Sequence, residues 1–284
     1  MGRIDLHVHS NASDGRFSPE EIVQKAAALG LTALALADHD SVAGVAPAVR
    51  AATAFPGLTV IPNVEISTDT DDGEVHVLGY FIDHTDAGLN ANLEGFRNSR
   101  LTRVRKMLAR LNDLGMPVAW QRVRELAGDG SFGRPHVARA MLEKGYITSF
   151  REAFEKYIGY GGPAYVPREK MTPDEAIDLI LRARGLPGLA HPFTMANVAA
   201  MVAKLKEAGL VALEAYYNGY TPGQRKTLVS LAQKYHLITT GGSDYHGLDD
   251  STETMLGNAG VPAESVKRLI ALAEQRGRKV ATPQ

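Results

Sequence analysis

The chain of 284 residues is apolar at 44% of its positions and charged at 22%, which excludes a disordered, collagen-like or coiled-coil protein. Lysine and arginine total 31 against 32 aspartate and glutamate, so a net charge of −1 gives no overall attraction to nucleic acid or a membrane surface. The absence of cysteine excludes disulfides and leaves only His, Asp and Glu to hold a metal. With no signal-peptide pattern and no apolar run near the ~20 residues of a membrane span, we expect a soluble, cytoplasmic protein with no membrane partner.

Seven short, apolar segments alternate with amphipathic helical segments, a pattern typical of parallel strands that are covered on both faces. The expected strands span residues 4–8, 31–37, 58–62, 75–81, 186–190, 211–215 and 237–240. Three of the helices should begin at Ser18, Thr172 and Thr221, each followed by proline and then by a Glu or Gln that can close a capping box. The alternation predicts an α/β fold, with a (β/α) barrel favoured over a doubly wound open sheet.

Helical segments replace the alternation between about residues 90 and 170. We expect a helical insertion at residues 96–165 that covers the active site of a barrel formed by residues 1–95 and 166–284. Its first helix has an apolar stripe that includes Leu101 and Val104, and its other positions are rich in arginine. The arginine-rich face is either a solvated surface or an electrostatic guide for an anionic substrate, and the sequence leaves both alternatives open.

Six of the nine histidines lie near the ends of expected strands, where the residues of a parallel barrel converge on one rim. A single buried histidine is more often a hydrogen-bonded core residue, but six together would repel one another when protonated and leave ring nitrogens unpaired. Carboxylates lie among them, so the group predicts a multinuclear metal site. Its members are His7, His9, His39, His76, His191 and His246, with Asp14, Glu65 and Asp244. His84 and His236 are expected to be structural.

Seven short motifs resemble, in order and spacing, those of the PHP (polymerase and histidinol phosphatase) superfamily. They are residues 5–10 (DLHVHS), 13–15 (SDG), 37–40 (ADHD), 64–67 (VEIS), 74–76 (EVH), 190–192 (AHP) and 242–246 (GSDYH). The resemblance implies a distorted seven-stranded (β/α) barrel and three divalent metal ions. It assigns His7, His9, Glu65 and Asp244 to the first ion, Glu65, His76 and His191 to the second, and Asp14, His39 and His246 to the third.

The same resemblance gives Glu65 and Asp244 a catalytic role beside a hydroxide that bridges two of the metals. Two ions at such a site can neutralise the charge of a displacement at phosphorus. Coordination mainly by imidazole favours manganese, or else iron or zinc, over magnesium or calcium.

Within the superfamily, residues 133–136 (GRPH), Arg139 and residues 162–167 (GPAYVP) resemble small bacterial phosphoesterases that act on nucleotides. Those enzymes remove the 3′-phosphate of nucleoside 3′,5′-bisphosphates, and some degrade short RNA from its 5′ end. The resemblance implies that Arg134 and His136 contact a substrate phosphate, with Arg139 behind them. The partner would be a small phosphorylated substrate, a nucleotide or a short RNA, without a stable nucleic-acid complex.

Three alternatives differ in the features that they require. Histidinol phosphatases, the nearest of the other small phosphomonoesterases, usually have histidine at the position of Asp14. Amidohydrolase-type C–N hydrolases often need a bridging lysine at a strand end, and none is found at the expected rim. A non-catalytic, metal-stabilised binding module would have lost ligands, whereas every expected ligand is present.

Overall fold

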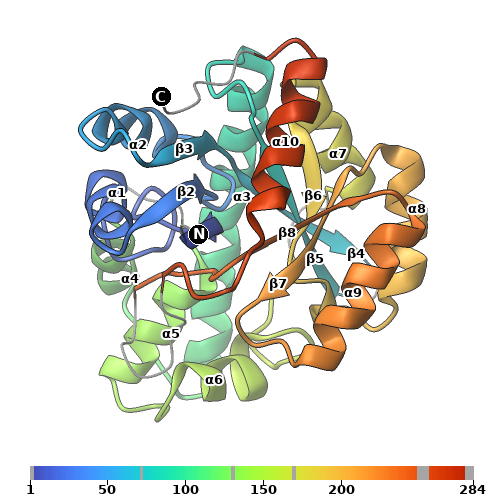
Figure 1. Cartoon of the computed structure of the whole chain (residues 1–284). Coiled ribbons are helices and arrows are strands. Elements are labelled where there is room, and N and C mark those ends of the chain that lie inside the picture. Colours follow the sequence, from blue (N-terminus) through green and yellow to red (C-terminus); the bar gives the residue numbers. More distant parts are fainter. Residues whose placement is uncertain (1–2, 71–72, 129–131, 168–170, 248–255, 279–284) are drawn as a thin grey trace.

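The computed structural model of the chain describes residues 3–70, 73–128, 132–167, 171–247 and 256–278 (Figure 1). Its strands form two sheets. The first sheet has the order β1-β2-β3 and is parallel, and the second has the order β4-β5-β6-β7-β8. The strands are β1 (Arg3–Val8), β2 (Leu31–Leu36), β3 (Thr59–Pro62), β4 (Glu65–Thr70), β5 (Gly73–Tyr80), β6 (Leu186–Leu189), β7 (Ala212–Tyr217) and β8 (Ile238–Gly242).

Helices cover the outer faces of the sheets, as the strand–helix alternation predicts. They are α1 (Pro19–Ala28), α2 (Val45–Ala52), α7 (Pro173–Arg182), α8 (Val198–Ala208), α9 (Pro222–Lys234) and α10 (Ala263–Gln275), with a 3₁₀ turn, η2 (Pro192–Thr194). The capping boxes expected at Ser18, Thr172 and Thr221 are confirmed at the starts of α1, α7 and α9. None of the helices in the described part of the chain combines the length and apolar character that a bilayer crossing requires.

The α/β fold is confirmed, and each of the seven expected strands overlaps an observed one, but the expectation of a wholly parallel arrangement is wrong at β5. That strand pairs antiparallel with β4 on one side and with β6 on the other. The sequence signal missed β4 because its residues are mostly polar, although nearly all of them are buried. The isolated bridges Val8↔Tyr245 and His39↔Glu65 connect the two sheets, and β1 lies beside β8. A seven-stranded barrel is therefore not confirmed.

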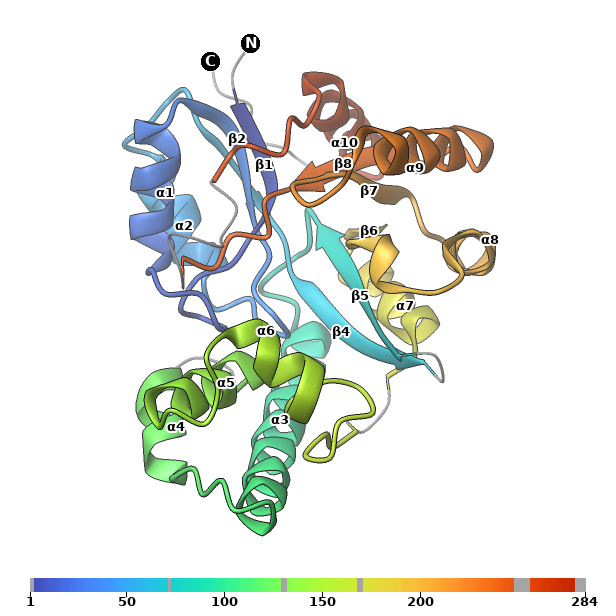
Figure 2. The same cartoon turned by 90° about the horizontal axis from the view of Figure 1, so that it is seen from below.

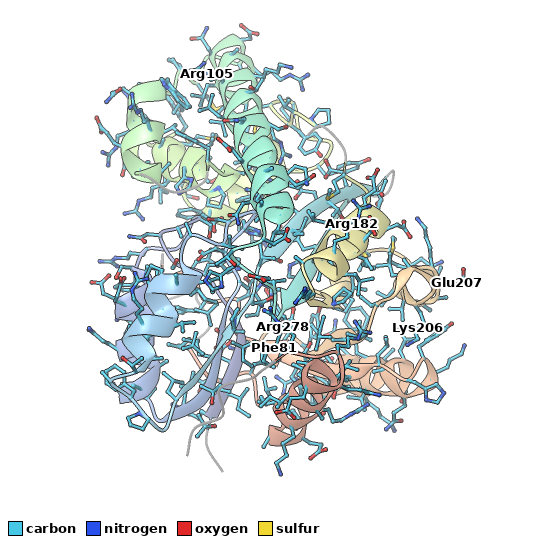
Figure 3. All side chains as sticks on the ribbon, turned by 90° about the horizontal axis from the view of Figure 1, so that it is seen from above. Phe81, Arg105, Arg182, Lys206, Glu207 and Arg278 are labelled. Carbon is cyan, nitrogen blue, oxygen red and sulfur yellow. The ribbon has the colours of Figure 1, made fainter. Side chains whose placement is uncertain are left out.

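The helical segment that interrupts the alternation lies on one side of the two sheets (Figure 2). It consists of α3 (Ala87–Asp113), α4 (Trp120–Ala127), α5 (Arg134–Glu143), α6 (Phe150–Ala153) and a π-helical turn, η1 (Phe154–Ile158). Val104, Leu111, Val137 and Met141 belong to an apolar core of this segment alone. Arg105 lies on the part of α3 that is remote from the sheets, whereas Arg182 ends α7 and Arg278 follows α10, two of the helices that cover the sheets (Figure 3).

Candidate metal centre

All nine residues expected as metal ligands come together where the strands of both sheets end. His7 is in β1 and His9 directly follows it, and His39, His191 and Asp244 follow β2, β6 and β8. Two of these positions have backbone angles that are uncommon for residues other than glycine, with φ of 22° at His191 and 55° at Asp244. Strain of this kind is concentrated at functional sites.

The first group of side chains is His7, His9, Glu65 and Asp244. His9 Nε2 lies 2.9 Å from Asp244 Oδ1 and 3.3 Å from Glu65 Oε2, and His7 Nε2 lies 3.3 Å from the same Glu65 oxygen. Despite these distances, both nitrogens and Glu65 Oε2 are buried without a hydrogen-bond partner. Neighbouring ligands of one ion are about 3.0–3.4 Å apart when each lies about 2.1 Å from it. The four side chains thus point at a common centre and fit a metal ion.

The second group shares Glu65 with the first. Glu65 Oε1 lies 2.9 Å from His76 Nδ1 and 3.0 Å from His191 Nε2, and these two nitrogens are 3.2 Å apart. His39 Nδ1 also approaches Glu65 Oε2 to 3.0 Å, and His39 joins Glu65 and His76 in a possible ligand set. Two imidazole nitrogens at this separation cannot both carry protons, and with both unprotonated they and Glu65 Oε1 can act as ligands of one cation.

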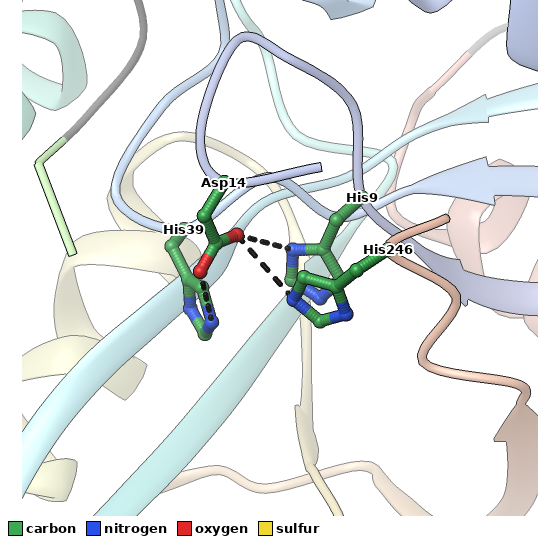
Figure 4. Close-up of side chains that lie close together, drawn as sticks. All are labelled: His9, Asp14, His39 and His246. Atoms are coloured by element: carbon green, nitrogen blue, oxygen red, sulfur yellow. Dashed lines mark ion pairs between the residues drawn. The ribbon is translucent and has the colours of Figure 1, made fainter. Parts of the chain in front are cut away.

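The third group surrounds Asp14 (Figure 4). Asp14 Oδ1 lies 3.4 Å from His246 Nε2 and 3.8 Å from His9 Nδ1, and Oδ2 lies 3.9 Å from His39 Nε2. Burial opposes ionisation of Asp14, but the charge of His246 and its hydrogen bond hold the pKa of the Asp14 carboxyl well below the usual range. Burial lowers the pKa of His39 to about 3, so its ring is neutral and can offer a lone pair. The sequence analysis did not place His9 in this group, where it faces the first group through one nitrogen and the third through the other.

A buried carboxylate that the sequence analysis missed, Glu214 in β7, holds two members of the cluster in place. Its oxygens lie 3.1 and 3.3 Å from His7 Nδ1, and one of them accepts the backbone N–H of His191 at 2.7 Å. With Nδ1 donating to Glu214, the Nε2 lone pair of His7 faces Glu65 and Asp244, as in the carboxylate–histidine pairs of metal sites. The available signal was a lone acidic residue inside an otherwise apolar strand.

A cavity of about 180 Å³ lies in front of the second and third groups. Asp14, His39, His76 and His246 line one part of it, and Arg100, Arg103 and Arg134 line another. Arg100 and Arg103 are only 6% and 5% exposed, so the solvated surface is wrong for these two residues, and their role as a guide for an anionic substrate stays a prediction.

Carboxylates hold these three arginines. Arg100 donates to Asp40 Oδ2 at 2.6 Å and to Ser67 Oγ at 2.7 Å. Arg103 donates through both terminal nitrogens to Glu74 Oε1 at 3.2 Å, and Arg134 donates to the other oxygen of Glu74. Three guanidinium groups thus face two carboxylates. The remaining positive charge suits an anionic ligand.

The structure does not bring His136 and Arg139 into this cavity with Arg134. The ring of His136 is buried, and its Nδ1 accepts the backbone N–H of Gly133 at 3.1 Å at the start of α5. Arg139 is 47% exposed and lies 3.7 Å from Glu143. Both residues line a second cavity, of about 860 Å³, which shares Asp14 and Pro135 with the first.

The fold and the clustered imidazoles and carboxylates define an α/β protein with a candidate multinuclear metal centre. The PHP domain family matches residues 5–160, more than half of the chain, and the chain belongs to that family.

Similar proteins support this assignment. The chain is 36% identical over 249 residues to the 5′-3′ exoribonuclease Rnm of Escherichia coli, and the matched region covers 85% of this chain and 84% of that protein. It is 32% identical over 251 residues to the 3′,5′-nucleoside bisphosphate phosphatase of Chromobacterium violaceum, and the matched region covers 87% of this chain and 88% of that protein. A solved structure described as a metal-dependent phosphoesterase from Bifidobacterium adolescentis is 28% identical to this chain and superposes with a TM-score of 0.86. The superposition covers 97% of this chain and 96% of that chain. These similarities place the chain among the phosphoesterases, a class of hydrolase.

Proposed function

We propose that the protein hydrolyses phosphate monoesters of nucleotides, and that its main substrate is the 3′-phosphate of nucleoside 3′,5′-bisphosphates. The observation that carries the proposal is the cavity in which possible metal ligands and arginines face each other. A substrate with two phosphates can then place one at the metal cluster and the other at the arginines. The Chromobacterium violaceum relative supports this substrate, and the Escherichia coli relative supports a second activity on short RNA from its 5′ end.

The nine side chains would hold three divalent ions, with Glu65 shared between the first two. The fit of the first group rests on its unpartnered nitrogens and its converging distances. Six imidazoles among nine ligands favour manganese, with iron or zinc as alternatives. Bound divalent ions supply the positive charge that neutralises a phosphate and lowers the pKa of water.

The chain's own residues orient the substrate and the ligands. Arg134 and Arg103 meet at Glu74, so a phosphate that approaches them can take up their remaining donors in a forked arrangement. The hydroxyl of Tyr217 donates to Asp244 Oδ2 at 3.1 Å and fixes that carboxylate while Oδ1 faces His9. Glu65 and Asp244 would take the catalytic role as ligands of the first metal site.

The division of the chain belongs to the same proposal. Residues 1–95 and 166–284 would form the metal-binding part, and residues 96–165 the insertion that supplies Arg100, Arg103 and Arg134. The bridges between the two sheets and the contact of β1 with β8 support a distorted barrel, here with the added strand β4. The separate apolar core of α3–η1 supports the insertion as a unit.

The test is phosphate release by the purified protein with Mn²⁺. The panel comprises a nucleoside 3′,5′-bisphosphate, the matching 3′- and 5′-monophosphates, histidinol phosphate and a 5′-phosphorylated short RNA. We expect the highest kcat/KM on the bisphosphate and release of its 3′-phosphate. A preference for histidinol phosphate would instead support the alternative phosphomonoesterase, and hydrolysis of no phosphate ester would support the non-catalytic binding module.

A further inference from the structure

The cavity of about 180 Å³ in front of the possible metal ligands is called the metal-side cavity below. The arginine-rich part of α3 extends well beyond the residues that line it. Residues 97–112 contain six basic side chains and no acidic one. Arg100 and Arg103 are buried at the cavity, whereas Lys106 and Arg110 are exposed. Lys106 has no ion-pair partner among the described residues. Arg100 and Arg103 are paired with Asp40 and Glu74, so the positive charge left for a ligand lies on the exposed Lys106 and Arg110. Exposed basic side chains on neighbouring turns of a helix are typical of surfaces that bind polyanions.

Tyr165, in the turn between η1 and α7, lies against this part of α3, and Tyr160 of the same turn lies beside Tyr165. Arg103 places its guanidinium carbon 5.2 Å from the centre of the Tyr165 ring, and Arg110 donates to the Tyr165 carbonyl. The rings of Tyr160 and Tyr165 are 5.4 Å apart with an angle of 66° between them. Tyr160 is 63% exposed, more than any other large apolar side chain in the described part of the chain. We define the α3 face as Lys106, Arg110, Tyr160 and Tyr165.

The turn that carries both tyrosines is held by its own backbone. Gly162 donates to the Gly159 carbonyl at 2.9 Å, Ala164 to the Tyr157 carbonyl at 2.9 Å, and Tyr165 to the Gly162 carbonyl at 3.0 Å. Gly161 has a φ of 75°, which favours glycine at the tip of the turn. The exposed ring of Tyr160 is thus presented by an ordered segment, which reduces the entropy lost when a ligand stacks on it.

Arg103 connects the α3 face to the metal-side cavity. It lines that cavity and also a groove of about 430 Å³ along α3, whose other walls include Thr102, Lys106 and Val166. Ligand sites for whole small molecules usually measure about 300–1,000 Å³, so the metal-side cavity of about 180 Å³ has room for a phosphate but not for several nucleotides. A longer substrate must therefore leave the cavity, and Arg103, which lines the cavity, lies between it and Lys106 and Tyr165 of the α3 face.

We propose that the α3 face binds single-stranded RNA, namely the nucleotides that follow the one at the metal centre. Tyr160 and Tyr165 stack on bases, and Lys106 and Arg110 contact backbone phosphates. Exposed aromatic rings beside cationic side chains are what unpaired RNA requires, because its bases are free to stack while its phosphates need neutralising. This inference rests on the proposed activity toward short RNA and adds the surface that selects polymers over mononucleotides.

The test measures kcat/KM on a 5′-phosphorylated dinucleotide and a 5′-phosphorylated pentanucleotide of RNA. We expect the wild type to prefer the pentanucleotide and Tyr160→Ala to lose about 5- to 150-fold on it, the range given by the loss of one stacked base. Tyr160→Phe keeps the aromatic face and should retain the preference. Lys206→Ala in α8, on the side of the molecule away from the insertion (Figure 3), is the charge-matched control for Lys106→Ala.

A binding measurement separates the contributions of stacking and charge. The anisotropy of a 3′-labelled pentanucleotide is followed with the full chain in EDTA, which prevents hydrolysis. Lys106→Ala should reduce the salt dependence of log Kd by about 0.7 per lost phosphate contact, whereas Tyr160→Ala should weaken binding without changing that slope.

Two results would overturn the inference. One is a wild type that hydrolyses the bisphosphate but shows no preference for the longer RNA, which would leave the proposed phosphatase activity intact. The other is unchanged pentanucleotide affinity in both Tyr160→Ala and Lys106→Ala. Absence of hydrolysis of every substrate would refute the proposed function itself, and is distinguished by the bisphosphate assay.

Discussion

Replacement of Glu214 by glutamine should weaken metal binding although Glu214 belongs to none of the three possible ligand groups. Its carboxylate is fully buried and accepts both the His7 ring N–H and the His191 backbone N–H. The glutamine side chain has one acceptor oxygen, so its amide group must face one of these two donors. Loss of a buried hydrogen bond to a charged group costs about 1.5–3 kcal/mol. Loss of a carboxylate that supports a metal ligand typically reduces affinity about 10- to 100-fold, or roughly 1.4–2.7 kcal/mol, and the two ranges agree.

The measurement is a competition titration of Mn²⁺ against a chelating dye at pH 7.5, with thermal melts of the metal-free proteins. Glu207→Gln, an exposed acid in α8, is the matched control and should bind Mn²⁺ as the wild type does. We expect Glu214→Gln to lose affinity at the tightest site by about 10-fold or more. Unchanged Mn²⁺ affinity, with only a lower Tm, would show that Glu214 supports the fold and does not orient His7 for a metal.

Three further predictions concern the ligands, the arginines and pH. Mn²⁺-saturated wild type should hold close to three ions per chain by elemental analysis and should lose activity with EDTA. His9→Ala should lose more than one ion, because the two ring nitrogens of His9 face different ligand groups. If His9→Ala still held three ions, His9 would not be shared between the two groups. Arg134→Ala should reduce kcat/KM on a 3′,5′-bisphosphate by about 2–4 kcal/mol while a small monophosphate ester changes far less; equal losses would remove Arg134 from the substrate site. In the metal-free protein, the neighbouring carboxylates of Asp14 and Asp244 outweigh burial and raise the pKa of His246 from 6.5 to about 10. The stabilisation that protonated His246 gives to the folded state is complete below pH 6.5 and is lost as the pH rises through 10. The Tm of the metal-free protein should therefore fall over that range, and the fall should be smaller in His246→Gln.

The positions of most of the clustered histidines could be predicted because they lie at or just after the ends of apolar strands, and strand ends converge in this architecture. The strand β4 could not be predicted in the same way, since its Ser, Thr and Asp residues are buried by pairing with β5 and not by apolar character. The role of the basic helix was ambiguous because helical spacing alone does not show which neighbour each face meets. Only the packing of α3 against the site separates Arg100 and Arg103 from the exposed Lys106.

The contact between β1 and β8 determines when the metal centre can form during biosynthesis. The backbone N–H of Asp244 donates to the His7 carbonyl at 2.8 Å, and that of His9 donates to the Tyr245 carbonyl at 2.9 Å. The group that begins with β1 is thus completed by residues that lie far later in the chain, after β8. A nascent chain that still lacks β8 carries most of the imidazoles but cannot complete the ligand groups. A metal ion could therefore stabilise the fold only after β8 has been synthesised. Chains truncated before β8 would therefore lack the stabilisation that a bound metal would provide.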